Sequence, residues 1–496
     1  MVSDHVSWRN NLNITVTKSD WLTALQCPRM AWHTLRAGAD SPTETELFRM
    51  EQGQEIGILA RKLFPSGVLV SGAPEKSAAD LTKELVMEDE SRVLFEPAFV
   101  AGQLIARADV LIRELAGWHV LEVKSSFSGT KDIKALLDDL AYTVMVINRA
   151  GEKVARASLI LLSRDFCFGD DEEKLFQIVT KSEEVIARAV AFEQNADSII
   201  EILSADEPPK ATLVSACRSC SLFATECLGA NIKHTVIEIP GLHHTKLKKL
   251  SDEGIVDVLS FPCDLPLNEA QERARQSMLS DAVFVSQNLR SALSPIQWPC
   301  SYLDFETVAT TLPLYKEHAC HQQVLTQFSV HQLDRVRSDP LHYEYLADAD
   351  RDCERELAES LISVLGNFGS VIVYSSFEKT RITSLKQRFM DLAGPLDQIL
   401  GRIFDLLPII KDNIYHPAFR GSFSIKKVLP ALVPELSYKN LDIRDGDTAI
   451  ARFARMAKGG MAEDDIEKTR KSLLDYCCLD TFAMVRLHEA LNEMAG

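Results

Sequence analysis

The hydrophobic pattern of the first half of the chain changes from helical to strand-like near residue 68. Residues 19–63 have apolar positions spaced for one helix face. Short β-type runs then predict strands at 95–100, 104–112, 118–123 and 157–162. A return to helical spacing predicts helices at 132–149 and 172–203. These elements indicate an α/β domain.

The second half begins with a polar, helical stretch and then alternates between strands and helices. The pattern predicts strands at 302–306, 327–331 and 371–374, with helices at 350–365, from 378 onward and at 463–494. This alternation favours a second α/β domain. We therefore expect one domain over 1–230, a helical connector over 231–297 and a second domain over 298–496.

Charge and composition limit the classes of function. The 496 residues contain 71 acidic and 54 basic residues, for a net charge of −17, so a broad basic surface for nucleic acid is excluded. A nucleic-acid contact would be a local patch, of which Lys246, Lys248 and Lys249 are the best candidate, or a metal site. Residues 1–13 are polar, without the apolar segment of a secretion signal, and no apolar run is long enough for a bilayer. We expect a cytoplasmic protein with no membrane partner, whose 11 cysteines are reduced.

Two carboxylates and a lysine fall close together in the predicted sheet of the first domain. Glu122 and Lys124 alternate with Val123, so both point to one face while Val123 points to the core. A hairpin at residues 116–117 would bring Asp109 beside them. Carboxylates bind hard cations such as Mg²⁺, and an ammonium group can orient water and offset phosphate charge. These residues indicate metal-assisted phosphodiester hydrolysis; the alternative is a surface ion pair on a strand.

Four cysteines have a spacing suited to a metal centre. Cys217 and Cys220 are two residues apart, Cys227 follows after six, and Cys27 lies far upstream. Zinc sites usually combine two close pairs or histidines, so three clustered thiolates and a distant one favour an iron–sulfur cluster. The alternative is a set of buried structural thiols.

The order of these motifs resembles the RecB/AddB-type PD-(D/E)XK nucleases, and most closely the iron–sulfur nucleases of CRISPR adaptation. The resemblance covers about residues 15–230 and implies a restriction-endonuclease-like fold. It implies that Asp109 and Glu122 bind Mg²⁺ or Mn²⁺ and that Lys124 is catalytic. It also implies one [4Fe–4S] cluster, bound by Cys27, Cys217, Cys220 and Cys227.

Two positions depart from that family. Its helix after the lysine strand often carries Gln-x3-Tyr, whereas this chain has Tyr142 with Asp138 in place of the glutamine. Its first helix often supplies a histidine ligand, for which Glu55 is the candidate substitute here. These departures are compatible with reduced or altered nuclease activity.

A second set of carboxylates appears in the C-terminal domain. Asp304 and Glu306 share one face of the predicted strand, and Tyr476 and Asp480 share one face of the last helix. Several converging carboxylates can hold two catalytic metal ions. The alternative is that both motifs are ordinary strand and helix surface.

This second set resembles the DEDD exonucleases of the ribonuclease H-like fold. The resemblance implies that Asp304, Glu306 and Asp480 bind metal and that Tyr476 orients the attacking water. Glu378 stands where the family's middle motif has an aspartate. Ser424 and Lys426 resemble the family's Ser-x-Lys segment before a helix, which implies that they contact substrate phosphate.

The whole chain also resembles a family of bacterial two-domain proteins of uncharacterised function. We expect a two-site exonuclease, with single-stranded DNA as substrate, degraded 5′→3′ by the first domain and 3′→5′ by the second. The chain lacks a Walker loop, so any helicase or ATPase would be a separate partner. One alternative is a nucleic-acid-binding iron–sulfur protein in which only the C-terminal site is catalytic, on RNA. Another is a redox sensor whose cluster controls nucleic-acid binding.

Overall fold

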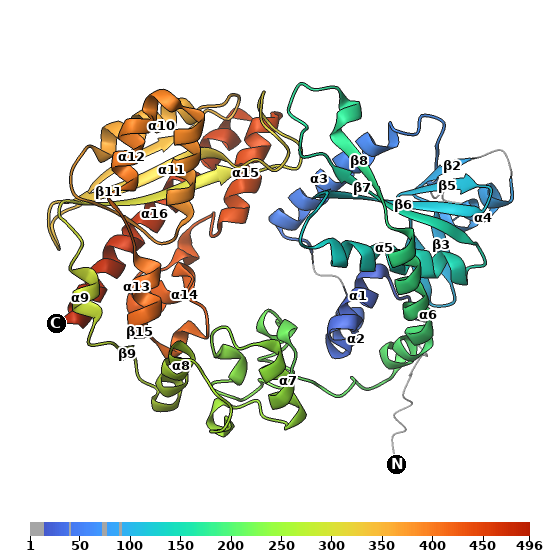
Figure 1. Ribbon diagram of the computed structural model, residues 1–496, viewed down its shortest axis with the longest axis horizontal. Helices are drawn as coiled ribbons and strands as arrows, with labels where there is room; N and C mark the ends of the chain where they lie inside the picture. Colours follow the sequence, from blue (N-terminus) through green and yellow to red (C-terminus); the bar gives the residue numbers. More distant parts are fainter. Residues whose placement is uncertain (1–13, 39–40, 72–76, 89–91) are drawn as a thin grey trace, which may run out of the picture. The chain divides into compact units, whose positions relative to one another are not determined.

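The chain forms two compact units in a computed structural model that describes residues 14–496, except 39–40, 72–76 and 89–91 (Figure 1). The polar segment 1–13 lies outside the described residues. Unit 1 is Met1–Thr212 and unit 2 is Leu213–Gly496. Both units combine helices with sheets, which confirms the α/β class. The division falls before the predicted boundary at 230, so three of the four candidate cluster cysteines belong to unit 2.

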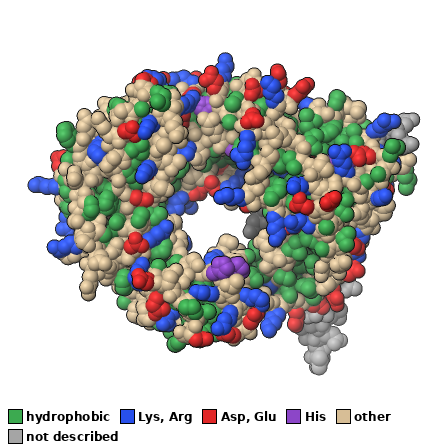
Figure 2. Space-filling view, in the orientation of Figure 1, with side chains coloured by type: hydrophobic (Ala, Val, Ile, Leu, Met, Phe, Trp, Pro, Cys, Tyr) green, Lys and Arg blue, Asp and Glu red, His purple; other side chains and the backbone are tan. Residues whose placement is uncertain are grey.

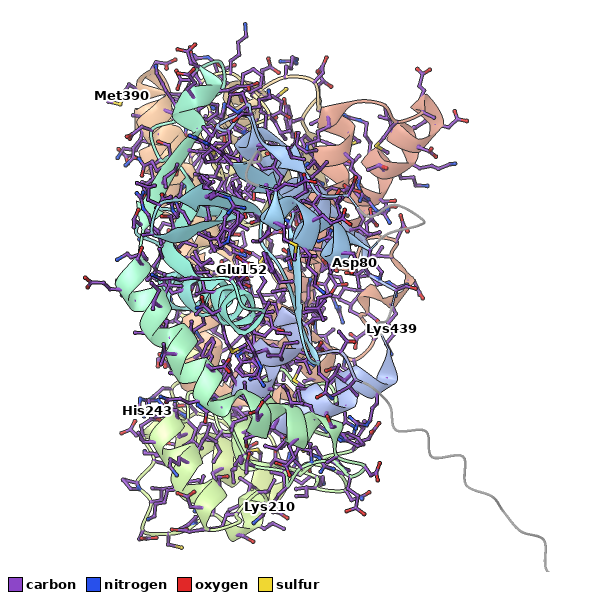
Figure 3. All side chains as sticks on the ribbon, turned by 90° about the vertical axis from the view of Figure 1, so that its right-hand side faces the viewer. Asp80, Glu152, Lys210, His243, Met390 and Lys439 are labelled. Atoms are coloured by element: carbon purple, nitrogen blue, oxygen red, sulfur yellow. The ribbon has the colours of Figure 1, made fainter. Side chains whose placement is uncertain are left out.

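Unit 1 is built on a six-stranded sheet with the order β1-β2-β5-β6-β7-β8. Its strands are β1 (Val68–Leu69), β2 (Val93–Phe95), β5 (Val110–Glu114), β6 (Gly117–Phe127), β7 (Val154–Leu162) and β8 (Phe176–Thr180). β6 and β7 are parallel and are connected through helix α5 (Ile133–Arg149). Trp118 at the start of β6 donates its Nε1 hydrogen to the carboxylate of Glu152 at 2.7 Å, which ties the turn after α5 to the sheet (Figure 3 labels Glu152).

Helices cover both faces of this sheet. Val120 of β6 shares a core with α5 and with Trp21 of α1, whereas Leu121 packs with Ala60 at the end of α3. The helices of unit 1 are α1 (Lys18–Gln26), α2 (Pro28–Ala37), α3 (Glu44–Arg61), α4 (Ala78–Met87), α5 and α6 (Ser182–Ser204). Glu122, the next residue of β6, therefore belongs to the α5 face.

Three sequence predictions for unit 1 were wrong in detail. The expected strand 95–100 is interrupted after Phe95, the last residue of β2, and resumes at Ala98 as β3 (Ala98–Ala101). The expected strand 104–112 is two strands, β4 (Leu104–Arg107) and β5, and Asp109 lies at the break between them. β4 pairs instead with β3 in a separate hairpin. The expected helix 172–203 begins with a short 3-10 helix (Glu172–Leu175) and continues as strand β8, because its Phe-Gln-Ile-Val-Thr segment pairs with β7 and favours extended structure.

Unit 2 is built on a five-stranded sheet with the order β12-β11-β10-β13-β14. Its strands are β10 (Cys300–Val308), β11 (Val324–Leu333), β12 (Leu341–Leu346), β13 (Ser370–Val373) and β14 (Ile403–Asp405). β12, β11 and β10 are antiparallel, and β10, β13 and β14 are parallel. Leu303 and Phe305 of β10 pack with α10 (Glu354–Leu365), α11 (Phe377–Arg388) and α12 (Ala393–Leu400) on one face (Figure 1). The opposite face packs against α16 (Glu463–Ala495), whose bounds nearly match the predicted helix.

The predicted connector is part of unit 2. Val236, Leu247 and Leu289 share one core with Tyr302 of β10 and Met484 of α16. The remaining elements are α7 (His244–Asp252), α8 (Glu269–Ser280), α9 (Leu289–Leu293), α13 (Leu406–Asn413), α14 (Ile425–Leu432), α15 (Gly446–Lys458) and the paired strands β9 (Phe284–Val285) and β15 (Ile414–Tyr415). None of the described helices is both long and apolar enough to cross a bilayer.

Candidate functional sites

Three carboxylates converge in unit 2. Asp304 and Glu306 lie on the face of β10 that packs against α16, and Asp480 lies on α16. One oxygen from each of the three lies within 4.8 Å of the others. Strand alternation and a helix that crosses the strand thus bring together residues that are far apart in the sequence. We refer to these residues together with Glu378 as the carboxylate cluster.

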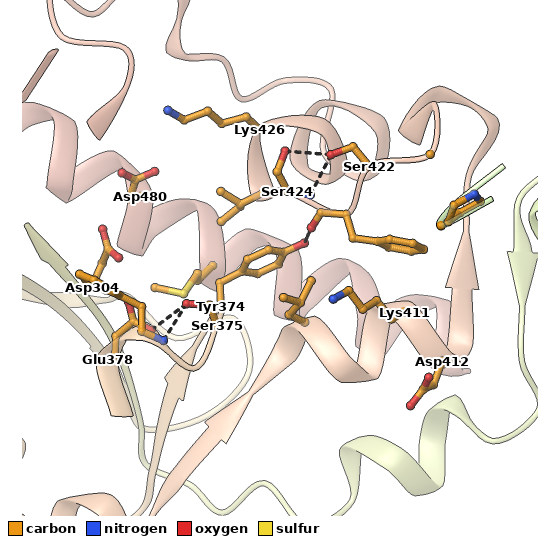
Figure 4. Close-up of a pocket in the computed structure, with 18 of the residues that line it drawn as sticks. Asp304, Tyr374, Ser375, Glu378, Lys411, Asp412, Ser422, Ser424, Lys426 and Asp480 are labelled. Atoms are coloured by element: carbon orange, nitrogen blue, oxygen red, sulfur yellow. Dashed lines mark hydrogen bonds between the residues drawn. The ribbon is translucent and has the colours of Figure 1, made fainter. Parts of the chain in front are cut away.

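Glu378 completes this cluster from the start of α11. Its side chain is 4% exposed and accepts a hydrogen bond from the Ser375 hydroxyl at 3.4 Å. Its carboxyl group lies beside that of Asp304, with Asp480 across from both (Figure 4). The structure therefore places all four predicted carboxylates of the C-terminal domain in one region.

The carboxylate cluster is an unfavourable place for four negative charges. Burial raises the pKa of every member: Glu306 to about 8, Glu378 to about 7, Asp480 to about 6, and Asp304 well above its ordinary range. Repulsion from Asp480 adds to the rise at Asp304 and Glu306. A cation at this position would offset that repulsion, and the all-oxygen donor set fits Mg²⁺ or Mn²⁺.

Two tyrosines and a lysine surround the carboxylate cluster. Tyr476 is 4% exposed on α16, one turn before Asp480. Lys426 of α14 has its Nζ 5.6 Å from the centre of the Tyr476 ring, and its charge partly opposes the rise in the pKa of Glu306. Tyr438 donates its hydroxyl hydrogen to Asp480 Oδ1 at 2.6 Å. Tyr438 was missed by sequence reasoning because it lies in a short turn outside any recognisable motif.

The carboxylate cluster opens into a cavity of about 960 Å³. Asp304 and Lys426 line one end of it, and Lys411 lies further along (Figure 4). Phe423 also lines this cavity. The size of the cavity suits a nucleotide or a similar ligand. Ser424, the residue before α14, also lines the cavity.

The predicted unit 1 residues lie on β6 and at the break before β5. Asp109 Oδ2 accepts a hydrogen bond from the Val123 backbone N–H at 2.6 Å. Glu122 is 3% exposed, and its Oε1 accepts a hydrogen bond from Lys124 Nζ at 3.1 Å. Lys124 and Glu122 share the α5 face as predicted, and Asp109 reaches β6 through the backbone of Val123.

Two further charged residues, which the sequence did not indicate, join this group. Lys18 of α1 donates to Glu122 Oε1 at 2.6 Å and to Asp139 Oδ2 at 3.0 Å. Lys124 lies 2.7 Å from the same oxygen of Asp139. Lys18, Glu122, Lys124 and Asp139 thus form a charge-balanced network, which we call the lysine–carboxylate network.

The network leaves one oxygen without a partner. Glu122 Oε2 is buried and makes no hydrogen bond among the described residues. Burial opposes ionisation of Glu122, but Lys124 and Lys18 outweigh it and lower its pKa to about 2. Burial and the charge of Glu122 raise the pKa of Asp109 to about 7. The orphaned oxygen and the adjacent Asp109 are donors that fit a hard cation.

The secondary candidates in unit 1 lie elsewhere. Tyr142 is fully buried and donates its hydroxyl hydrogen to the backbone oxygens of Val16 and Ile105, at 2.8 and 3.1 Å. Asp138, at the family's glutamine position, forms an ion pair with Arg188, while its neighbour Asp139 faces the network. Glu55 is half-buried in α3 and does not line the cavity of about 740 Å³ beside Asp109.

The candidate cluster cysteines are divided between the units. Cys27 caps α2, and its Sγ accepts a hydrogen bond from the Met30 N–H at 3.5 Å. Cys217 Sγ likewise accepts from the Val214 N–H at 3.4 Å. Cys217, Cys220 and Cys227 do not form a group of three sulfurs within 4.8 Å of one another among the described residues. A tetrahedral zinc site, with Zn–S bonds of about 2.3 Å, would require such a group.

Each lysine of the predicted basic patch contacts an oxygen atom within the chain. Lys248 pairs with Asp252 at 2.9 Å, and Lys249 lies 3.6 Å from Asp264. Lys246 donates to the backbone oxygen of Pro266. Lys and Arg side chains are interspersed with Asp and Glu over the face shown in Figure 2.

The chain is similar to a domain of unknown function and to two uncharacterized proteins. The model of a domain of unknown function, DUF2779, matches residues 301–424, a span that contains Asp304, Glu306 and Glu378 but ends before Asp480. An uncharacterized protein of Mycoplasma pneumoniae, the MG366 homolog, is 25% identical over 236 residues, which are 42% of this chain and 35% of that protein. The MG366 protein of Mycoplasma genitalium is 23% identical over 209 residues, 38% of this chain and 31% of that protein. The chain thus matches about a third of the length of these curated relatives.

Proposed function

We propose that this chain is a metal-dependent nuclease that hydrolyses phosphodiester bonds at two separate sites, with single-stranded DNA as the substrate. The observation that carries the proposal is the convergence of Asp304, Glu306 and Asp480 within 4.8 Å, beside Glu378. Four neighbouring acids, two buried and two half-buried, destabilise the fold when they are ionised. A bound cation would offset their charge and give them a role in catalysis.

The residues around the carboxylate cluster have distinct roles in this proposal. A divalent ion held there would activate water and stabilise the leaving oxygen. Tyr476 would orient the attacking water, and Tyr438 holds Asp480 through its hydroxyl. Lys426, which lines the same cavity, would bind a substrate phosphate.

The strand arrangements support the two folds that we propose. In unit 2, three antiparallel strands continue into two parallel ones, and Asp304 lies on the central strand β10, as expected of a ribonuclease H-like fold. In unit 1, the Glu122–Lys124 strand is followed by a helix and a parallel strand, as expected of a PD-(D/E)XK fold. The [4Fe–4S] cluster is part of the proposal. The N–H···S hydrogen bonds at Cys27 and Cys217 support it, because such bonds stabilise thiolates.

A second candidate is a nucleic-acid-binding iron–sulfur protein in which only the unit 2 site is catalytic, on RNA. The lysine–carboxylate network favours it, because two lysines already neutralise Glu122 and Asp139. On this alternative, unit 1 would bind nucleic acid without cutting it.

The test is degradation of end-labelled single- and double-stranded DNA and RNA by anaerobically purified protein, with Mg²⁺ or Mn²⁺. We expect metal-dependent shortening of single-stranded DNA that Asp480→Asn reduces. Shortening of RNA alone would favour the second candidate. Intact substrates of all four kinds with both metals would refute the nuclease proposal.

A further inference from the structure

A group of nitrogen and sulfur donors lies in unit 2, separate from the carboxylate cluster. His331 of β11 and His342 of β12 are directly paired across the two strands, and their rings stack with centres 4.5 Å apart. Cys478 of α16 has its Sγ 4.0 Å from His342 Nδ1. One ligand atom from each of the three lies within 4.8 Å of the others.

We propose that His331, His342 and Cys478 form a binding site for a zinc-class divalent ion. Two imidazoles and one thiolate are donors that zinc prefers, whereas Mg²⁺ and Mn²⁺ prefer oxygen. The donor set is therefore chemically distinct from the all-oxygen carboxylate cluster.

In each histidine ring, one nitrogen is hydrogen-bonded to a hydroxyl group. His331 Nδ1 lies 2.8 Å from Thr481 Oγ1, and His342 Nε2 lies 2.9 Å from Ser329 Oγ. With both rings donating to these hydroxyls, His331 Nε2 and His342 Nδ1 keep their lone pairs for a metal. Thr481 can pass its own hydrogen to the Cys478 backbone oxygen at 3.1 Å, so donors and acceptors balance. Such outer hydrogen bonds are typical of histidines that bind metal.

The environment also supplies a candidate fourth ligand. Glu344 follows His342 by two residues, on the same face of β12, and pairs in register with Ser329.

The site would connect the β11–β12 hairpin to α16. Cys478 and Thr481 flank Asp480 on that helix, so a bound ion would hold the segment that carries part of the carboxylate cluster. This role would be structural, because no donor of the site belongs to that cluster.

Cobalt(II) titration of the metal-stripped full chain, in excess Mg²⁺ to occupy oxygen ligands, tests the proposal. Thiolate coordination gives a charge-transfer band in the near ultraviolet, and zinc should displace it. Cobalt bound to Cys217, Cys220 or Cys227 would absorb equally in the wild type and in Cys478→Ser. This contribution therefore cancels in the difference spectrum of the two proteins. We expect that difference to contain the band, with Cys263→Ser, an exposed control cysteine, giving none.

His342→Ala provides a second, independent variant on an edge strand. It should weaken cobalt binding by about tenfold or more, because even the outer partners of metal ligands contribute 10–100-fold. Thermal unfolding of each variant without metal confirms that it is folded. Identical cobalt spectra for the wild type and Cys478→Ser, or unchanged affinity in His342→Ala, would overturn the proposal.

Discussion

The contacts of Glu122 distinguish a catalytic role of the unit 1 residues from a purely structural one. Its Oε1 accepts hydrogen bonds from Lys18 and Lys124, while its buried Oε2 has no partner among the described residues. A purely structural ion pair would leave no carboxylate oxygen unsatisfied, since a buried unpaired oxygen costs stability. The orphaned oxygen is therefore the feature that favours metal binding.

Lys124→Ala separates the two interpretations. Removing Lys124 deletes its contacts with Glu122 and Asp139, and Lys18 still pairs with both. We expect unit 1 to remain folded but to lose about 1.5–3 kcal/mol of stability, the usual contribution of hydrogen bonds to charged groups. One nucleolytic activity should be lost with it.

The control is Lys62→Ala, which removes an exposed pair with Glu172. Stability should change by less than about 1 kcal/mol, and activity should not change. Denaturant unfolding and degradation assays measure both quantities. If Lys124→Ala loses stability but keeps every activity, unit 1 is a binding platform.

Asp304→Asn should have opposite effects on stability and activity. Burial and repulsion from the neighbouring carboxylates raise the pKa of Asp304, so its negative charge destabilises the folded protein. Because asparagine lacks this charge, the metal-free variant should melt at a higher temperature. Activity should fall by more than about 100-fold, since even outer partners of metal ligands contribute 10–100-fold. The stabilisation of the wild type by Mg²⁺ should also be lost.

The matched control for this variant is Asp475→Asn, at an exposed position of α16. It should change neither the melting temperature nor the activity appreciably. A lower melting temperature for metal-free Asp304→Asn would mean that the carboxylate has a structural role instead.

Repulsion among the ionised carboxylates of the cluster destabilises the packing of β10, α11 and α16. The stability of the folded protein should therefore depend on pH. The folded-state pKa values of Glu306 and Glu378, about 8 and about 7, exceed the ordinary value of 4.5. The folded state therefore binds more protons than the unfolded state, so stability falls as pH rises through this window. Buried histidines such as His331 and His488 have pKa values near 4 and oppose this trend only below about pH 6.5.

We therefore expect the melting temperature of the metal-free protein to fall between about pH 6.5 and pH 8. Saturating Mg²⁺ should reduce the slope, because the bound cation favours the ionised carboxylates. Calorimetry across this range, with and without Mg²⁺, measures the effect. A melting temperature that rises with pH in the metal-free protein would contradict the pKa directions.

The sequence predicted those site residues whose positions follow from local periodicity. Alternation placed Asp304 and Glu306 on one face of β10, and helical spacing placed Tyr476 and Asp480 together, as the structure shows. Such patterns depend on one element at a time. Glu378, at the start of α11, was indicated instead by the resemblance to the family's middle motif.

Residues that reach a site from another element could not be predicted in this way. Lys18 lies on α1 and meets Glu122 only through tertiary packing. Asp139 rather than Asp138 faces the network, because the phase of α5 depends on how the helix packs on the sheet. Tyr438 reaches Asp480 from a turn with no periodic pattern. Strand β8 was mistaken for helix because a short apolar run is ambiguous without its partner strand.

For the molecule as a whole, the [4Fe–4S] proposal requires cysteines from both units. Anaerobically purified protein should contain about four irons per chain. Cys27→Ser and Cys220→Ser should each reduce the iron content strongly, whereas the exposed Cys263→Ser should not. Iron analysis and the visible absorption spectrum measure this. A full iron complement in Cys27→Ser would exclude Cys27 as a ligand, and one zinc in place of iron would overturn the cluster.

The central claim is that the chain contains two independent nuclease sites, one in each unit. The most direct measurement is product length against time for 5′- and 3′-labelled single-stranded DNA with Mg²⁺, comparing the wild type with Asp304→Asn, Asp480→Asn, their double variant and Lys124→Ala. We expect each unit 2 variant to lose 3′→5′ trimming, and the double variant to be little worse, because ligands of one metal site act as a unit. Lys124→Ala should instead remove the 5′→3′ activity alone. Intact 3′→5′ trimming in Asp304→Asn, or loss of both polarities in Lys124→Ala, would contradict the two-site account.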